Sequence, residues 1–197
     1  MSDVRRLYER YAREFDRERD RGLMERAYLT EVATRLRSGA WVLDLGCGAG
    51  EPIARFFIER GFRLTGIDAA PSMVALSRER FPHAIWDVAD MRGLALAVRF
   101  DAAIAWDSLF HLTQDEQRAM FPIFRKHLNH DALLLFTSGP RAGEAIGCFQ
   151  GHDLHHASLD PDEYRALLAA SGLRPLLYRP EDPDCGGHTV WLAQLVS

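Results

Sequence analysis

The stretch VLDLGCGAGEP at residues 42–52 decides the fold of this chain. It starts with an apolar run that is typical of a short buried strand, and glycines then occupy positions 46, 48 and 50. Glycine lets a backbone adopt positive φ and lets a ligand approach closely, although three glycines can also serve only to make a tight turn. Pro52 suits a first helical position. The stretch therefore predicts a strand, a glycine turn and a helix.

The rest of the chain repeats this alternation of strand and helix. Such alternation predicts parallel βαβ units with right-handed crossovers. We expect strands at residues 41–45, 62–68, 83–90, 99–107, 131–138, 173–179 and 188–196, and helices at 52–61, 71–81, 113–128 and 160–172. The Pro- and Gly-rich turn before the last strand makes an antiparallel hairpin. The sequence thus predicts an α/β fold with a mostly parallel sheet, in one domain over residues 1–197.

Two helices are expected before the first strand. Apolar residues recur every four positions from Met24 to Leu36, which is the period of an amphipathic helix. Tyr8, Tyr11 and Phe15 have helical spacing in the segment before it. These aromatic side chains can pack on the core or cover a binding site, and the spacing fits both.

Composition limits the class of protein. The chain has 197 residues, of which 47% are hydrophobic and 26% charged, and its net charge is −4. This is typical of a globular protein without strong attraction to nucleic acid, and no apolar stretch approaches the roughly 20 residues that span a bilayer. The charged start and three cysteines without CxxC spacing favour the cytoplasm. The excess of arginine over lysine points to a bacterial source.

The glycine spacing distinguishes two classes of ligand. The glycines follow the pattern G-x-G-x-G, and Glu51 stands where the dinucleotide fingerprint has its third glycine. An acid at a helix N-terminus is a poor neighbour for a pyrophosphate, but it suits a ligand that carries a sulfonium and an ammonium. An NAD(P)-dependent oxidoreductase is therefore disfavoured, although it stays an alternative.

The segment VLDLGCGAG, with GID at residues 66–68 ending the next strand, resembles motif I and its acidic partner in class I S-adenosylmethionine-dependent methyltransferases of the small-molecule type. The resemblance covers nearly the whole chain. It implies a seven-stranded Rossmann-like sheet of order 3-2-1-4-5-7-6 with strand 7 antiparallel and helices on both faces. It also implies a helical lid at residues 1–38 and a methyl donor lying across strands 1 and 4.

The resemblance assigns roles to acids at the strand ends. Asp68 would bind the ribose hydroxyls, or else cap the following helix. Asp90 and Met91 would receive the adenine, and Asp87 competes with Asp90 for that role. Asp44 would face the methionine moiety, anchor the glycine turn, or do both. The expected donor-binding residues are Tyr11, Asp44, Gly46, Cys47, Gly48, Gly50, Asp68, Ala69, Asp90, Met91 and Trp106.

Histidines gather in the loops that should form the acceptor side. His111 is the candidate general base or acceptor-orienting donor, and a packing role without chemistry is the alternative. We expect an irregular covering loop at residues 139–160. The expected acceptor-pocket residues are Asp107, Ser108, His152, His155 and His188. The histidines could bind a divalent metal, but HDLHH lacks a defined ligand frame, so no metal is expected.

These features favour one activity. We expect transfer of a methyl group from S-adenosyl-L-methionine to a small-molecule acceptor at oxygen or nitrogen, which leaves S-adenosylhomocysteine. No NPPY-like tetrapeptide, the pattern of adenine and glutamine N-methyltransferases, follows the fourth strand. Neither nucleic acid nor a membrane is the expected partner. A donor-binding protein without catalytic activity and a metal-binding protein remain alternatives.

Overall fold

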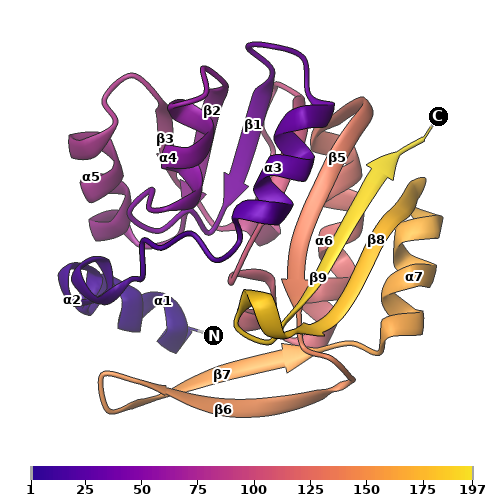
Figure 1. Ribbon diagram of the computed structural model, residues 1–197. Coiled ribbons are helices and arrows are strands. Elements are labelled where there is room, and N and C mark those ends of the chain that lie inside the picture. Colours follow the sequence, from indigo (N-terminus) through magenta and orange to yellow (C-terminus); the bar gives the residue numbers. More distant parts are fainter. Residues whose placement is uncertain (1, 197) are drawn as a thin grey trace.

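The first strand, β1 (Trp41–Leu45), lies in the middle of a seven-stranded sheet of order β3-β2-β1-β4-β5-β9-β8 (Figure 1). This computed structural model describes residues 2–196. Strands β1 to β5 run parallel, and β9 is antiparallel to both β5 and β8. The expected α/β architecture is confirmed, since β9 and β8 are the strands expected as 7 and 6. The strands of this sheet are β1, β2 (Arg63–Asp68), β3 (Ile85–Val88), β4 (Phe100–Ala105), β5 (Leu128–Ser138), β8 (Leu173–Asp182) and β9 (His188–Leu195).

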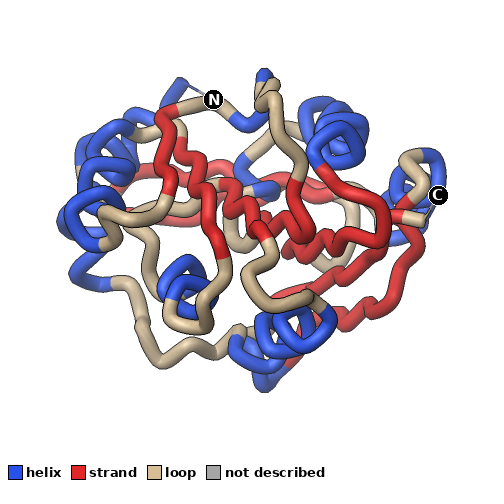
Figure 2. The backbone as a smooth tube through the Cα atoms, turned by 90° about the horizontal axis from the view of Figure 1, so that it is seen from above, coloured by secondary structure: helices blue, strands red, loops and turns tan. Residues whose placement is uncertain are grey.

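Helices cover both faces of the sheet (Figure 2). Successive strand residues point to opposite faces, so Val42 packs with one core cluster while Leu43 packs with the other. The helices α3, α4 and α5 pack in the cluster that contains Val42, and α6 and α7 pack in the cluster that contains Leu43. The α-helices are α1 (Ser2–Arg10), α2 (Ala12–Glu18), α3 (Arg26–Arg35), α4 (Ile53–Ile58), α5 (Pro71–Arg80), α6 (Gln114–His127) and α7 (Pro161–Ala170). Short 3-10 turns occupy Met91–Gly93, Leu109–His111 and Pro183–Cys185.

The first 38 residues divide between two places. The helix α3 buries Tyr28, Leu29 and Val32 in the core. The helices α1 and α2 instead lie beyond the carboxyl ends of the parallel strands (Figure 1). A covering role therefore concerns α1 and α2, because α3 is part of the core.

The expectation of an irregular loop over residues 139–160 was wrong. Strands β6 (Gly143–Phe149) and β7 (His152–Ser158) form a separate antiparallel hairpin there. Its two-residue turn, Gln150 and Gly151, has positive φ at both positions (53° and 75°), which is the geometry that matches the twist of a tight hairpin. Most residues of β6 are exposed. Its sequence, GEAIGCF, therefore does not alternate between apolar and polar residues, and this alternation is the pattern that would have predicted a strand. The hairpin lies on the same side as α1 and α2 (Figure 1).

Within residues 2–196, no helix is long and apolar enough to cross a membrane. The longest, α6, has 14 residues and charged side chains at both ends. Its N-terminus carries a capping box between Thr113 and Glu116, which satisfies free backbone amides of the first turn.

Gly66 of β2 allows Trp86 to pack beneath the glycine turn. A Cβ atom at this position would overlap the Trp86 ring and come within 2.9 Å of Cys47 Sγ. We predict that Gly66→Ala lowers the free energy of unfolding by about 1–3 kcal/mol, because the core must move to admit the methyl group. Denaturant titration would measure this. Gly93→Ala is the control, since nothing lies within 4 Å of a Cβ atom there, and equal effects of the two changes would contradict the packing argument.

Candidate functional site

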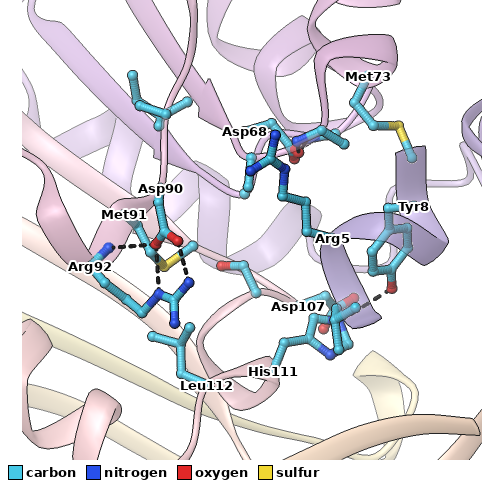
Figure 3. Close-up of a pocket in the computed structure, with 18 of the residues that line it drawn as sticks. Arg5, Tyr8, Asp68, Met73, Asp90, Met91, Arg92, Asp107, His111 and Leu112 are labelled. Atoms are coloured by element: carbon cyan, nitrogen blue, oxygen red, sulfur yellow. Dashed lines mark hydrogen bonds and ion pairs between the residues drawn. The ribbon is translucent and has the colours of Figure 1, made fainter. Parts of the chain in front are cut away.

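Two adjoining cavities open at the carboxyl edge of the sheet, and Figure 3 shows the first of them. The first cavity extends over the ends of β2 and β3, and the second lies over β1 and β4. The walls that both share come from α1, α2, the glycine turn and the segment after β4: Tyr8, Phe15, Gly46, Gly48, Asp107 and His111. This is the edge where ligands bind in open α/β sheets.

The glycines of the turn have two different roles. Gly46 and Gly48 line both cavities and have positive φ of 75° and 52°. A Cβ atom at Gly46 would collide with Ser108, so that glycine permits close packing as well. Gly50 lines neither cavity: its Cβ atom would come within 3.1 Å of the rings of Phe81 and Trp86. Gly50 thus packs against these rings, and its contact with the donor stays a prediction.

Asp68 joins the glycine turn to the start of α5. Its Oδ2 accepts a hydrogen bond from the Gly48 amide at 2.9 Å, and its Oδ1 accepts one from the Ala70 amide at 2.8 Å. The carboxyl group also lines the first cavity beside Ala69, and burial raises its pKa. Anchoring of the backbone and access to the cavity thus occur together at this residue.

Asp44 is a buried acid in the wall of the second cavity. Its exposed fraction is 3%, and burial together with the nearby Asp68 raises its pKa to about 7. Among residues 4–196, no side chain forms an ion pair with it. Such a carboxyl group is costly to ionise without a partner, and a cationic ligand would supply one.

Trp106 lines the same cavity, and its indole nitrogen is buried behind the wall. Its indole Nε1 is the one buried side-chain nitrogen or oxygen in the described part of the chain that has no hydrogen-bond partner. Arg19 also lines this cavity, 3.1 Å from Glu25 and 3.9 Å from Asp107. Cys47 lines the cavity too, and burial raises the pKa of its thiol, which favours the neutral form. The second cavity therefore offers both acidic and donor groups.

The far end of the first cavity holds Asp90 and Met91, while Asp87 does not line it. Both oxygens of Asp90 bind Arg92, whose guanidinium lies across the carboxylate (Figure 3). These bonds lower the pKa of Asp90. An ionised carboxylate has about four acceptor positions, so it can still accept from a ligand.

His111 is neutral and hydrogen-bonded within the wall of both cavities. Burial lowers its pKa to about 4. Its Nδ1 is 3.4 Å from the His155 carbonyl oxygen, which only accepts, so Nδ1 carries the proton and Nε2 accepts a hydrogen bond from the Tyr8 hydroxyl at 3.2 Å. Burial also raises the pKa of that hydroxyl to about 12. The lone pair of Nε2 is thereby occupied. This arrangement fits an orienting role of His111 better than a general base.

Asp107 and His188 form an ion pair that connects segments 81 residues apart. The His188 Nε2 is 2.7 Å from Asp107 Oδ1, and its Nδ1 is 2.7 Å from the Cys185 carbonyl oxygen. Both partners are acceptors, so each ring nitrogen carries a proton and His188 is an imidazolium. The hydrogen bond to Asp107 raises its pKa accordingly. The Trp106 ring stacks on this cation at 5.6 Å.

Besides Gly50, three expected site residues lie outside both cavities: Tyr11, His152 and His155. The Tyr11 hydroxyl is 3.0 Å from His152 Nε2, which joins α2 to the hairpin, and His155 Nε2 is 3.4 Å from Glu144. Tyr8 and Phe15, rather than Tyr11, are the aromatic residues of the N-terminal helices that line the cavities. Ser108, which was expected in the acceptor pocket, lines only the first cavity. The sequence interpretation also missed Phe110 and Phe149, because their contacts with distant residues arise from the hairpin.

No group of three or more His, Cys, Asp or Glu side chains in the described part of the chain could hold a metal ion. The histidines of the hairpin point to different partners: His152 to Tyr11, and His155 to Glu144. Cys148 is exposed, whereas Cys47 and Cys185 are buried and separate.

The His188 pair predicts a pH-dependent contribution to stability. A group with a raised folded pKa stabilises fully below its unfolded pKa, near 6.5, and this contribution is lost as pH rises through the folded pKa. We predict that His188→Gln lowers the free energy of unfolding more at about pH 5.5 than at about pH 9. Urea titration at both pH values measures this, with the exposed His83→Gln as control. A loss that does not change with pH would contradict the imidazolium.

Known proteins share both the sequence motif and the fold. The family described as "Methyltransferase domain" matches residues 42–131. The 27-O-demethylrifamycin SV methyltransferase of Amycolatopsis mediterranei is 29% identical over 174 residues, covering 77% of this chain and 64% of that protein. The chain spans about three fifths of the length of the curated relatives that it matches over most of its own length.

Solved structures extend the fold likeness over nearly the whole chain. CalS10, an amino pentose methyltransferase from Micromonospora echinaspora with S-adenosylmethionine bound, has a TM-score of 0.73 at 21% identity and covers 96% of this chain and 97% of that one. The 1,6-didemethyltoxoflavin-N1-methyltransferase of Burkholderia thailandensis has a TM-score of 0.76 at 21% identity, covering 98% and 88%. These solved structures show that the chain shares the fold of S-adenosylmethionine-dependent methyltransferases, and residues 42–131 match the family described as a methyltransferase domain.

Proposed function

We propose that the protein transfers a methyl group from S-adenosyl-L-methionine to a small-molecule acceptor, at oxygen or nitrogen. The observation that carries this proposal is the pair of acids on either side of the glycine turn, the buried Asp44 and the half-buried Asp68, which line the two cavities. A nicotinamide dinucleotide would bring a pyrophosphate to this turn, next to two carboxyl groups and Glu51. A sulfonium donor brings positive charge instead.

We assign the adenosine part of the donor to the first cavity. Asp68 would accept from the ribose hydroxyls through lone pairs that its two backbone hydrogen bonds leave free. Asp90 and Met91 would hold the adenine, and Ala69 would contact it from the end of β2. When bound, the donor supplies an electrophilic methyl group on sulfur.

We assign the methionine part to the second cavity. Asp44 would face the ammonium, which explains a buried acid without a cation in the described residues. Arg19 suits the carboxylate of the donor. Of the three arginines Arg17, Arg19 and Arg21, only Arg19 lines either cavity.

The N-terminal helices and the hairpin close this arrangement. Phe149 of β6 stacks on Tyr8 at 5.5 Å and meets Phe15 edge-to-face at 5.9 Å, so the three rings cover the shared wall of the cavities. Excluding water strengthens electrostatic contacts inside and aligns the reacting groups. His111, held by Tyr8, would orient the acceptor nucleophile.

The proposed acceptor is a small molecule, as the names of the structural relatives suggest for those proteins. The net charge of −4 is not suited to nucleic acid or to an anionic membrane surface. From the cysteine usage and the arginine excess we further expect the cytoplasm of a bacterium.

Donor binding is the first test. We predict that S-adenosylhomocysteine and S-adenosylmethionine bind at about micromolar strength in isothermal titration calorimetry, whereas NADH does not bind. Binding of NADH alone would overturn the proposal and point to an oxidoreductase. Methyl transfer to candidate acceptors would then be measured from the amount of S-adenosylhomocysteine that is released.

Two acids near the cavity allow a matched test of the ribose assignment. We predict that Asp68→Asn weakens S-adenosylhomocysteine binding about 10- to 100-fold, because charge-assisted hydrogen bonds to the ribose are lost. The control is Asp87→Asn, an exposed position on β3 outside the first cavity. Unfolding of each variant without ligand separates loss of the Gly48 anchor from loss of binding. Near wild-type affinity in a folded Asp68→Asn protein would exclude the ribose role.

A further inference from the structure

A third cavity adjoins the second one on its outer side. It is an open groove of about 430 Å³ between the end of β5, the base of the hairpin and the turn before β9. Phe110, His156 and His188 line both the second and the third cavity. These three side chains therefore stand between the proposed donor site and the third cavity.

The two partners of the Asp107–His188 ion pair line different sides of this boundary. Asp107 lines the first and second cavities but not the third, whereas His188 lines the second and third. The carboxylate is thus on the side of the cationic donor, and the imidazolium also faces the outer cavity. A negative group in the third cavity would meet the imidazolium ring through charge alone, because both N–H groups of His188 already bind Asp107 and the Cys185 carbonyl oxygen.

A second cation lines the third cavity farther out. Arg141, in the segment between β5 and β6, is exposed, and no described residue forms an ion pair or a hydrogen bond with its side chain. The acid that lines this cavity, Glu144, lies 3.4 Å from His155 Nε2. An arginine without an acidic partner can bind a carboxylate or a phosphate through two parallel N–H donors.

The walls of the boundary are aromatic. The Phe110 and His156 rings meet at 4.9 Å between centroids with an angle of 70°, and burial lowers the pKa of His156, which favours its neutral form. Flat aromatic walls with few polar groups suit a planar apolar ring.

We propose that the third cavity binds an aromatic acceptor that carries an anionic group, with this group facing Arg141 and His188 and the ring against Phe110 and His156. This inference rests on the proposed methyl transfer, since it names the class of acceptor. The acceptor's nucleophile then points past His188 toward the second cavity, where the methyl group is supplied. The ion pair holds opposite charges toward the two substrates, a cationic donor and an anionic acceptor.

The test uses probes of matched shape and different charge. Benzoate and benzamide differ in the charge of one group, and their dissociation constants would be measured by calorimetry on the protein saturated with S-adenosylhomocysteine. We expect benzoate to bind about tenfold tighter than benzamide, as a charge-assisted contact predicts. Phenyl phosphate and benzylamine complete the series: the first distinguishes a phosphate from a carboxylate, and the second should bind weakest.

Variants of the outer cavity separate the two cations from a general charge effect. Arg141→Gln should remove most of the preference for benzoate, and Arg141→Glu should reverse it. Glu144→Gln should tighten benzoate binding, because it removes the acid of the same cavity. The matched control is Arg174→Gln, an exposed arginine on β8 whose side chain contacts only Gln194 among the described residues.

The outcomes are distinct for the inference and for the proposed function. If the unaltered protein does not bind S-adenosylhomocysteine, the proposed function itself is wrong. If S-adenosylhomocysteine binds but benzamide or benzylamine binds as tightly as benzoate, or no probe binds, the inference is wrong and the proposed function stands. A preference for benzoate that survives Arg141→Glu would also overturn it.

Discussion

The whole site depends on two hydrogen bonds from backbone amides to one carboxyl group. Asp68, at the end of β2, binds the amide of Gly48 in the glycine turn and the amide of Ala70 before α5. These bonds hold the turn of β1 and the end of β2 in register, so that the two cavities share the Gly46 and Gly48 wall. The Gly46 and Cys47 amides also bind the Ile67 carbonyl oxygen, so Asp68 completes a set of hydrogen bonds that fixes the shape of the turn.

The acids of the molecule divide into those with a cationic partner and those without one. Glu51 binds Arg55 and also lies 3.6 Å from Arg80, and Asp16 binds Arg80. Asp44, in contrast, is buried in the wall of the second cavity without such a partner in the described residues, and its pKa is raised to about 7. Because burial of an unpaired acid opposes folding, a site of this kind is more consistent with a bound cation than with a structural role.

Segments that are far apart in the chain complete the site. The hairpin brings Phe149 to Tyr8 and Phe15, and the turn before β9 brings His188 to Asp107. Both additions lie at the carboxyl edge, because β5 ends there and the antiparallel β9 begins there. The parallel half of the sheet thus supplies the proposed donor site, while the hairpin and the antiparallel strand supply the proposed acceptor side.

The sequence by itself determined the sheet, its order through the resemblance, the glycine turn, and the places of Asp44, Asp68 and Asp90 at strand ends. Local spacing fixes the strands, the turn and the places of these acids, since a strand, its turn and the next helix are neighbours in the chain, whereas the strand order came from the resemblance alone. Only the tertiary structure decided that Tyr8 rather than Tyr11 lines the cavities, that Gly50 serves packing, and that His188 is the charged histidine while His111 is neutral. The direction of a side chain in a broken helix and the protonation of a histidine depend on partners far along the chain, and no local pattern records them.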